Sequence, residues 1–124
     1  MSTGLLNTRY LAGSPGGNVA GASLATGLTA FAGGGQTGAL LLQAVQNVVA
    51  TVATTGDSVA LPQSAAQMFM MIANQGANSM NVFPYPGDSI NALSVNAPFA
   101  LAAGKTAIFS SAGWGQPWFS VVSA

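Results

Sequence analysis

The sequence predicts an all-β protein whose body is a β-sandwich or a barrel, and three observations support this class. Turn-forming residues recur every ~8–12 residues from residue 36 onward, as is typical of such folds. The segments between these turns are short and rich in Val, Ile, Thr and Phe. Long helices are disfavoured, because their surface positions would be filled by Ser, Thr, Asn and Gln, which favour turns and short strands.

The distribution of glycine divides the chain near residue 36. Ten of the 16 glycines fall within the first 38 residues. We expect residues 1–35 to form an extended Gly-rich N-terminal arm and residues 36–124 to form the body. A disordered linker seldom carries many apolar side chains, so we expect this arm to become ordered on a partner surface. The side chains expected to make that contact are Leu5, Leu6, Arg9, Tyr10, Leu11, Leu24, Leu28 and Phe31.

Within the body, short apolar runs between turn signals predict the strands. We expect them at residues 47–53, 58–61, 67–74, 80–83, 89–93, 97–101, 105–111 and 118–122. The polar residues 75–79 predict a hairpin loop that returns the chain beside 67–74. The turn at residues 102–104 places Lys105 in a second hairpin. Residues 39–46 could instead form a helical turn or two.

The strand at 67–74 is apolar on both faces, because side chains alternate between the two faces of a strand. One face carries Met68, Met70 and Ile72, and the other carries Phe69, Met71 and Ala73. Most strands of a small two-layer domain have water on one side. Either the arm covers the second face of this strand, or a face meets another subunit, and methionine suits such irregular contacts. The residues expected at a subunit interface are Met68, Met70, Ile72, Met80 and Phe83.

Charge is almost absent. Only four residues carry a formal charge, and the chain has no Glu, His or Cys, whereas a typical domain is about 25% charged. Acids, bases, nucleophiles and metal ligands come largely from the missing types. We therefore expect no enzymatic activity, no cofactor and no metal. Near-zero net charge promotes association, which favours a structural protein bound to something large.

The same composition limits the partners. Two basic residues cannot neutralise enough phosphates to hold nucleic acid. The most apolar stretch, residues 39–53, contains Gln43, Gln46 and Asn47 and is shorter than the roughly 20 residues of a membrane span. We expect neither a nucleic-acid nor a membrane partner.

Two local motifs have both a chemical and a structural interpretation. Residues 33–38 match the dinucleotide fingerprint G-x-G-x-x-G, but the motif needs a preceding strand and a βαβ unit, and a glycine hinge explains it more simply. Gly-Asp-Ser occurs at residues 56–58 and again at 87–89. We interpret both as turns that enter a strand, although the two aspartates could in principle form a carboxylate pair or share a Ca²⁺ ion.

Two tryptophans, Trp114 and Trp118, flank a loop of Gly, Pro and Gln near the C-terminus. Exposed tryptophans can stack on sugars, so this loop is a candidate glycan contact. The alternative is that one or both pack in the core or at an interface.

Several segments resemble a known family. Residues 47–62, 72–84, 87–91 and 101–107 are similar to small β-rich proteins encoded among the head genes of tailed bacteriophages, some of which are capsid decoration (cement) proteins. The resemblance covers roughly residues 36–122 and does not cover the arm.

The resemblance implies a β-sandwich or jelly-roll-like body, often trimeric, that sits where capsomers meet and carries no catalytic residues. The expected partners are the major capsid protein and further copies of the chain. The expected location is the outer capsid surface of the virion, after synthesis in the host cytoplasm. The alternative is a head-fibre or tail-associated module that contacts host glycans through Trp114 and Trp118.

Overall fold

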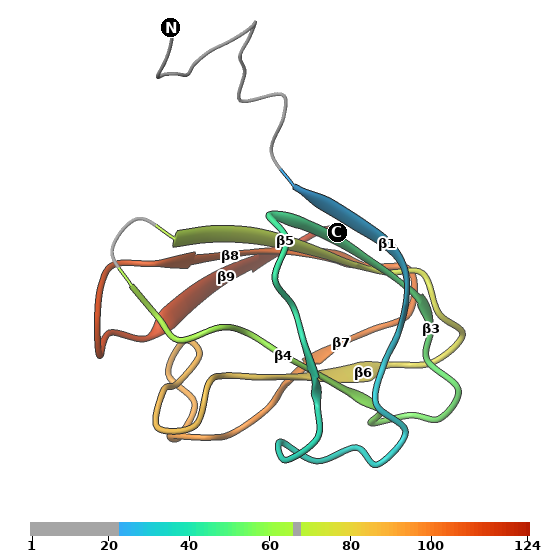
Figure 1. The fold of residues 1–124 in the computed structure, drawn as a ribbon, viewed down its shortest axis with the longest axis horizontal. Helices are drawn as coiled ribbons and strands as arrows, with labels where there is room; N and C mark the ends of the chain where they lie inside the picture. Colours follow the sequence, from blue (N-terminus) through green and yellow to red (C-terminus); the bar gives the residue numbers. More distant parts are fainter. Residues whose placement is uncertain (1–22, 66–67) are drawn as a thin grey trace, which may run out of the picture.

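The computed structural model describes residues 23–65 and 68–124, and these residues form strands, turns and loops with no helix (Figure 1). The strands are β1 (Leu24–Thr29), β2 (Leu40–Leu41), β3 (Gln46–Thr51), β4 (Ser58–Ala60), β5 (Met68–Asn74), β6 (Met80–Phe83), β7 (Phe99–Leu101), β8 (Thr106–Ser111) and β9 (Trp118–Val122). The prediction of an all-β protein is confirmed. A helical turn at 39–46 does not form, because β2 occupies part of that segment.

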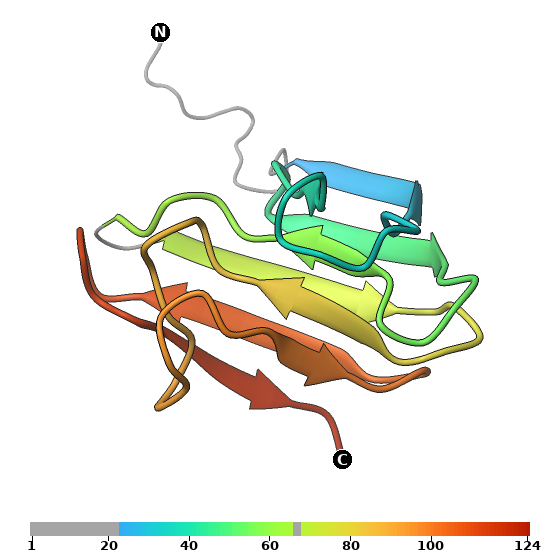
Figure 2. The same cartoon turned by 90° about the horizontal axis from the view of Figure 1, so that it is seen from below.

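The strands form two mixed sheets that lie one above the other (Figures 1 and 2). The five-stranded sheet has the order β1-β3-β5-β8-β9, and the four-stranded sheet has the order β2-β4-β6-β7. Inward side chains from both sheets make one apolar core, which lies between them. Within it, the rings of Phe99 and Phe109 pack edge to face with their centroids 5.6 Å apart.

From β1 to β6 the chain winds between the sheets, so that successive strands alternate from one sheet to the other. As a result β1, β3 and β5 pair in parallel, and so do β2, β4 and β6. Parallel neighbours need a crossover connection, and here a strand of the opposite sheet supplies it. The antiparallel strands β7, β8 and β9 then complete the far side of both sheets.

The sheet topology corrects three expectations. Residues 80–83 do not return beside 67–74 as a hairpin, because β5 and β6 belong to different sheets. The hairpin expected around Lys105 is wrong for the same reason: β7 and β8 lie in different sheets, and the turn between them, where Gly104 adopts a φ of 80°, carries the chain from one sheet to the other. Residues 89–93 do not form a strand. Only Ile90 makes a β-bridge, to Trp118, and the positive φ of 53° at Asn91 turns the chain away.

The described part of the expected arm belongs to the body. β1 is an edge strand paired with β3, and Phe31 and Ser58 exchange two backbone hydrogen bonds of 2.8 and 3.0 Å. Leu28 packs against the core and Ala30 is buried within it. The boundary expected at residue 36 is therefore too late, because a short apolar strand precedes it. Residues 1–22, with Leu5, Leu6, Arg9, Tyr10 and Leu11, lie outside the described residues.

The glycines of residues 33–38 form a folded loop and not a hinge. The Phe31 ring lies against this loop, and a Cβ atom at Gly33 or Gly38 would collide with it. Gly34 and Gly38 also adopt positive φ values of 73° and 88°, which glycine reaches without strain. Glycine is needed here for close packing and turning, which explains the local enrichment without an extended arm.

Candidate contact surfaces

Three charged residues lie within the described ranges, namely Asp57, Asp88 and Lys105. Both carboxylates accept backbone hydrogen bonds. Oδ2 of buried Asp57 accepts from Thr54 N at 3.1 Å, within its own turn, and Oδ2 of Asp88 accepts from Ser64 N at 2.9 Å. These contacts hold loops in place, which is a structural role.

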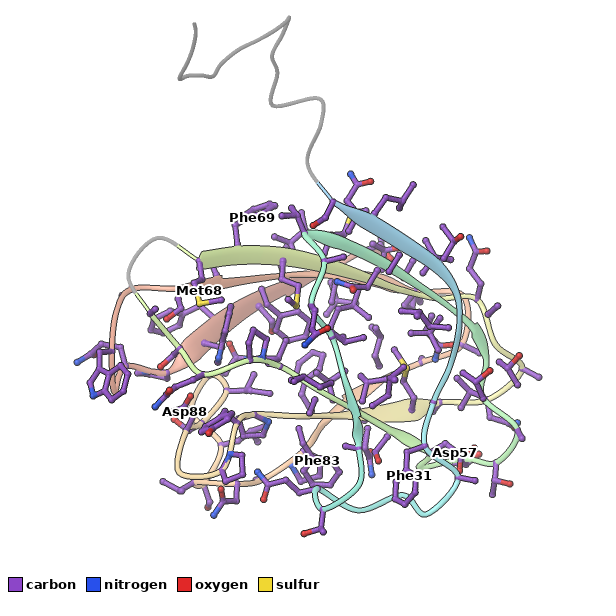
Figure 3. The ribbon with its side chains drawn as sticks, viewed as in Figure 1. Phe31, Asp57, Met68, Phe69, Phe83 and Asp88 are labelled. Atoms are coloured by element: carbon purple, nitrogen blue, oxygen red, sulfur yellow. The ribbon has the colours of Figure 1, made fainter. Side chains whose placement is uncertain are left out.

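The two Gly-Asp-Ser segments have matching geometry, since Gly56 and Gly87 both adopt a φ of 94°. The first turn enters β4, as expected, whereas the second precedes only the bridge at Ile90. Figure 3 shows Asp57 and Asp88 on opposite sides of the molecule, so they form neither a carboxylate pair nor a shared ion site. In residues 23–65 and 68–124, no cluster of three or more His, Cys, Asp or Glu side chains forms.

The residues expected at a subunit interface do not form one. Met70, Ile72 and Met80 are buried in the protein's own core, Phe83 is also buried, and Met68 packs against the core from its edge. The correction follows from strand alternation: Met68, Met70 and Ile72 share the inner face of β5, because the second sheet covers that face. Figure 3 shows Met68 on the inner side of β5 and Phe69 on the outer side.

The opposite, outer face of the five-stranded sheet is apolar as well. Its most apolar part comes from the neighbouring strands β5, β8 and β9, and we call these side chains the outer-face cluster: Phe69, Met71, Ile108, Phe119 and Val121. All but the half-buried Met71 are exposed, and Val121 reaches 71% exposure.

Strand register brings the cluster together in two rows. Met71 pairs with Ile108, and Ile108 pairs with Val121, which makes a continuous apolar row. In the second row Ser110 stands between Phe69 and Phe119.

The outer face continues across the other two strands without charge. Leu24 of β1, which the sequence assigned to the arm, pairs with Gln46 of β3, and Gln46 pairs with Met71. Of the described charged residues, none lies in a strand of this sheet. Antiparallel sheets commonly place polar residues on their outer face, so this surface departs from the pattern of a solvated sheet.

At the β9 edge of the same sheet, hydrogen bonds from a loop already occupy part of the strand. Asn91 N donates to Trp118 O at 2.6 Å, Asn91 Oδ1 accepts from Ser120 N at 3.0 Å, and Asn91 Nδ2 donates to Ser120 Oγ at 2.8 Å. These bonds occupy edge positions of β9 that another strand would otherwise use. The face is therefore more accessible to a partner than this edge.

A second exposed apolar region lies on two loops, and we call it the loop end. The residues 84–98 connect β6 to β7, and the residues 112–117 connect β8 to β9. The bridge between Ile90 and Trp118 holds the first loop against the strand that follows the second. The exposed apolar side chains of these loops are Tyr85, Leu93, Val95 and Trp114.

The two tryptophans have different environments. Trp114 is 73% exposed, whereas Trp118 is 0% exposed and packs in the core. The expectation that both contact a glycan is therefore wrong for Trp118, because an inward position on β9 removes its ring from solvent. One exposed tryptophan is left on the loop end. The remaining expected contact residue, Phe31, is exposed but lies against its own glycine loop.

Comparison of the chain with protein-family models, with curated proteins and with solved structures finds no match. Within the described ranges, no helix has the length and apolar character that a membrane crossing requires. We therefore infer function from the two exposed apolar surfaces and from the resemblance described above.

Proposed function

We propose that the protein is a structural decoration (cement) protein of a phage head. It binds the outer surface of the shell as a homo-oligomer and bridges neighbouring capsomers, and its partner is the major capsid protein. The observation that carries this proposal is the presence of two exposed apolar regions, the uncharged outer face of the five-stranded sheet and the loop end, in which Asp88 is the one charged residue. A bridging protein needs at least two contact surfaces, one for each neighbour.

Low charge supports this role physically. Closely packed copies on a shell would repel one another if each carried a large net charge, and this chain carries a net charge of zero. Near-zero net charge also favours association. The two stacked sheets provide a rigid body, which we propose to be a β-sandwich, and rigid contact surfaces lose little conformational entropy on binding.

The loop end is the surface that we assign to the shell. Loops carried on a rigid scaffold commonly hold binding residues, and here one long loop contributes Leu93 and Val95 while a second contributes Trp114. The leading residues Leu5, Leu6, Arg9, Tyr10 and Leu11 are proposed as an additional shell contact. Several copies in one oligomer would present these contacts together, so that weak contacts sum through effective concentration.

Binding to purified expanded heads that lack decoration tests this function, with co-sedimentation as the readout. Val95→Lys places a charge on the loop end. Because Val95 is 60% exposed, the variant should keep the native fold. Leu41→Lys is the matched control, since Leu41 is 47% exposed on the four-stranded sheet.

We expect the natural chain to saturate heads at a fixed ratio to the capsid protein. Val95→Lys should weaken binding by about tenfold or more, because a desolvated charge without a partner opposes an apolar contact. Leu41→Lys should bind within about twofold of the natural chain. Absence of saturable binding, or equal loss in both variants, would contradict the proposal.

A further inference from the structure

The outer-face cluster is a surface that neither the described fold nor the loop end accounts for. Its side chains stand on the central strand β5 and on its neighbours β8 and β9, in the register given above. Monomeric proteins rarely expose extended apolar patches, and those that do commonly use them to bind another protein. We therefore expect another molecule, an occupant, to cover the cluster.

We propose that the occupant is a second copy of this chain, packed face to face about a two-fold axis. This inference deepens the proposed function, because it names the contact that holds the homo-oligomer together. Only the biological role of the dimer rests on the proposed function. A two-fold contact uses the same patch on both copies, so the patch must complement itself.

The charge distribution meets this requirement. The described strands of the five-stranded sheet carry no charged residue, so two copies can approach without like-charge repulsion. Two such faces would pack about 10 Å apart, the spacing at which the side chains of facing sheets interdigitate.

The size of the face limits the strength of the contact. Five strands spaced at ~4.8 Å, with about six residues each at ~3.3 Å, make a face of about 20 Å by 20 Å. Two such faces bury about 800 Å², roughly half of the ~1,600 Å² of a standard interface, which is the range of weak contacts. We therefore expect a concentration-dependent dimer with a Kd of about 1–100 μM, which further contacts on a shell would reinforce.

Pairing of sheet edges is a less favourable mode for a second copy. The bonds from Asn91 occupy part of the β9 edge, and the β1 edge is irregular, with register shifts on both sides of Leu28. Bulged edges resist the addition of a strand. The flat outer face remains the surface that a second copy can cover.

Sedimentation equilibrium of the full-length chain between about 1 μM and 1 mM tests the inference, a range that brackets the expected Kd. Val121→Lys introduces a charge into the cluster at its most exposed position, and each dimer would contain that charge twice. Phe119→Ser removes apolar area without adding charge. Leu41→Lys is again the control, since it adds the same charge to an exposed leucine of the other sheet. Near-ultraviolet circular dichroism checks that each variant keeps the native packing.

We expect the natural chain and Leu41→Lys to form dimers, with Val121→Lys weakened by at least about tenfold and Phe119→Ser weakened less. A natural chain that stays monomeric to 1 mM, a trimer, or equal weakening by Val121→Lys and Leu41→Lys would overturn the inference. Head binding separates the two proposals. A monomeric Val121→Lys that binds heads more weakly than the natural chain supports both, because it keeps the loop end and loses the contacts that an oligomer shares. A natural chain that dimerises but binds no heads contradicts only the decoration function.

Discussion

Gly76 occupies a position where no other residue fits, although its backbone conformation is ordinary. A Cβ atom there would lie 2.6 Å from Val52 N and 2.7 Å from Val52 Cγ2. Gly76 N also donates to Asn74 Oδ1 at 3.0 Å, while Asn74 Nδ2 donates to Leu101 O at 2.9 Å. The β5–β6 connection is thereby fixed against both β3 and β7.

We predict that Gly76→Ala destabilises the protein by about 1–3 kcal/mol, because the added methyl group collides with the backbone of Val52 as well as with its side chain. Gly113→Ala is the matched control, since nothing lies within 4 Å of its Cβ position and its φ is not positive. Urea unfolding measures both. Equal stability of the two variants would show that the connection has room to shift.

The type of a residue does not by itself predict whether its side chain is buried. Trp114 and Trp118 look alike in the sequence, yet one is exposed and the other lies in the core. Asp57 was correctly interpreted as part of a turn that enters a strand, and its carboxylate accepts from Thr54 N within that turn. Asp88 follows a glycine of the same φ, but its turn enters no strand and its carboxylate accepts from the distant Ser64 N. Burial depends on which face of a strand the second sheet covers, and no local pattern specifies that.

At the scale of elements, Asn91 determines how β9 ends the five-stranded sheet. Its backbone adopts a φ of 53°, and its side chain makes two hydrogen bonds with Ser120. A positive φ is more accessible to Asn and Gly than to other residues. The same residue therefore turns the 84–98 loop and holds it against the strand.

We predict that Asn91→Ala destabilises the protein by about 1–3 kcal/mol, because it loses both side-chain bonds and places alanine in a strained conformation. Asn91→Gly should cost less, since glycine keeps the backbone conformation and loses only the side-chain bonds. Thermal and urea unfolding compare the two. If alanine proved as stable as the natural residue, Asn91 would not hold the edge of β9.

The elements were more predictable than their arrangement. β3, β5, β6, β8 and β9 lie within two residues of the expected strands, because apolar alternation between turn signals is a local property. The parallel pairing of β3 with β5 and of β4 with β6 was not foreseen, since a hairpin and a crossover to the other sheet share the same sequence alternation. β1 was assigned to the arm because glycines crowd the first 38 residues, yet one of them, Gly27, adopts a φ of 67° within a paired strand.

The interface residues were misassigned for the same reason. The sequence showed that both faces of residues 67–74 are apolar, which the structure bears out for the described part of that segment, Met68–Asn74. Choosing between the faces needed the position of the four-stranded sheet. Phe119 and Val121 carried a usable signal, since they alternate with Trp118 and Ser120, and a buried tryptophan would have placed them outside.

At the scale of the whole molecule, the chain combines a well-packed core with surfaces that water solvates poorly. Three charged residues lie in the described ranges, none of them in the five-stranded sheet, and the exposed apolar residues concentrate on the outer face and the loop end. Such a surface favours permanent residence in an assembly over a dispersed existence. Two distinct surfaces would allow one copy to contact another copy and the proposed shell together.

The proposed decoration function is the central claim, and it is tested most directly by the copy number of the protein in purified, intact particles of the proposed phage. Quantitative mass spectrometry against the major capsid protein supplies that ratio. The account predicts a fixed, stoichiometric ratio that survives repeated gradient purification. Particles that are complete and stable without this chain would contradict it.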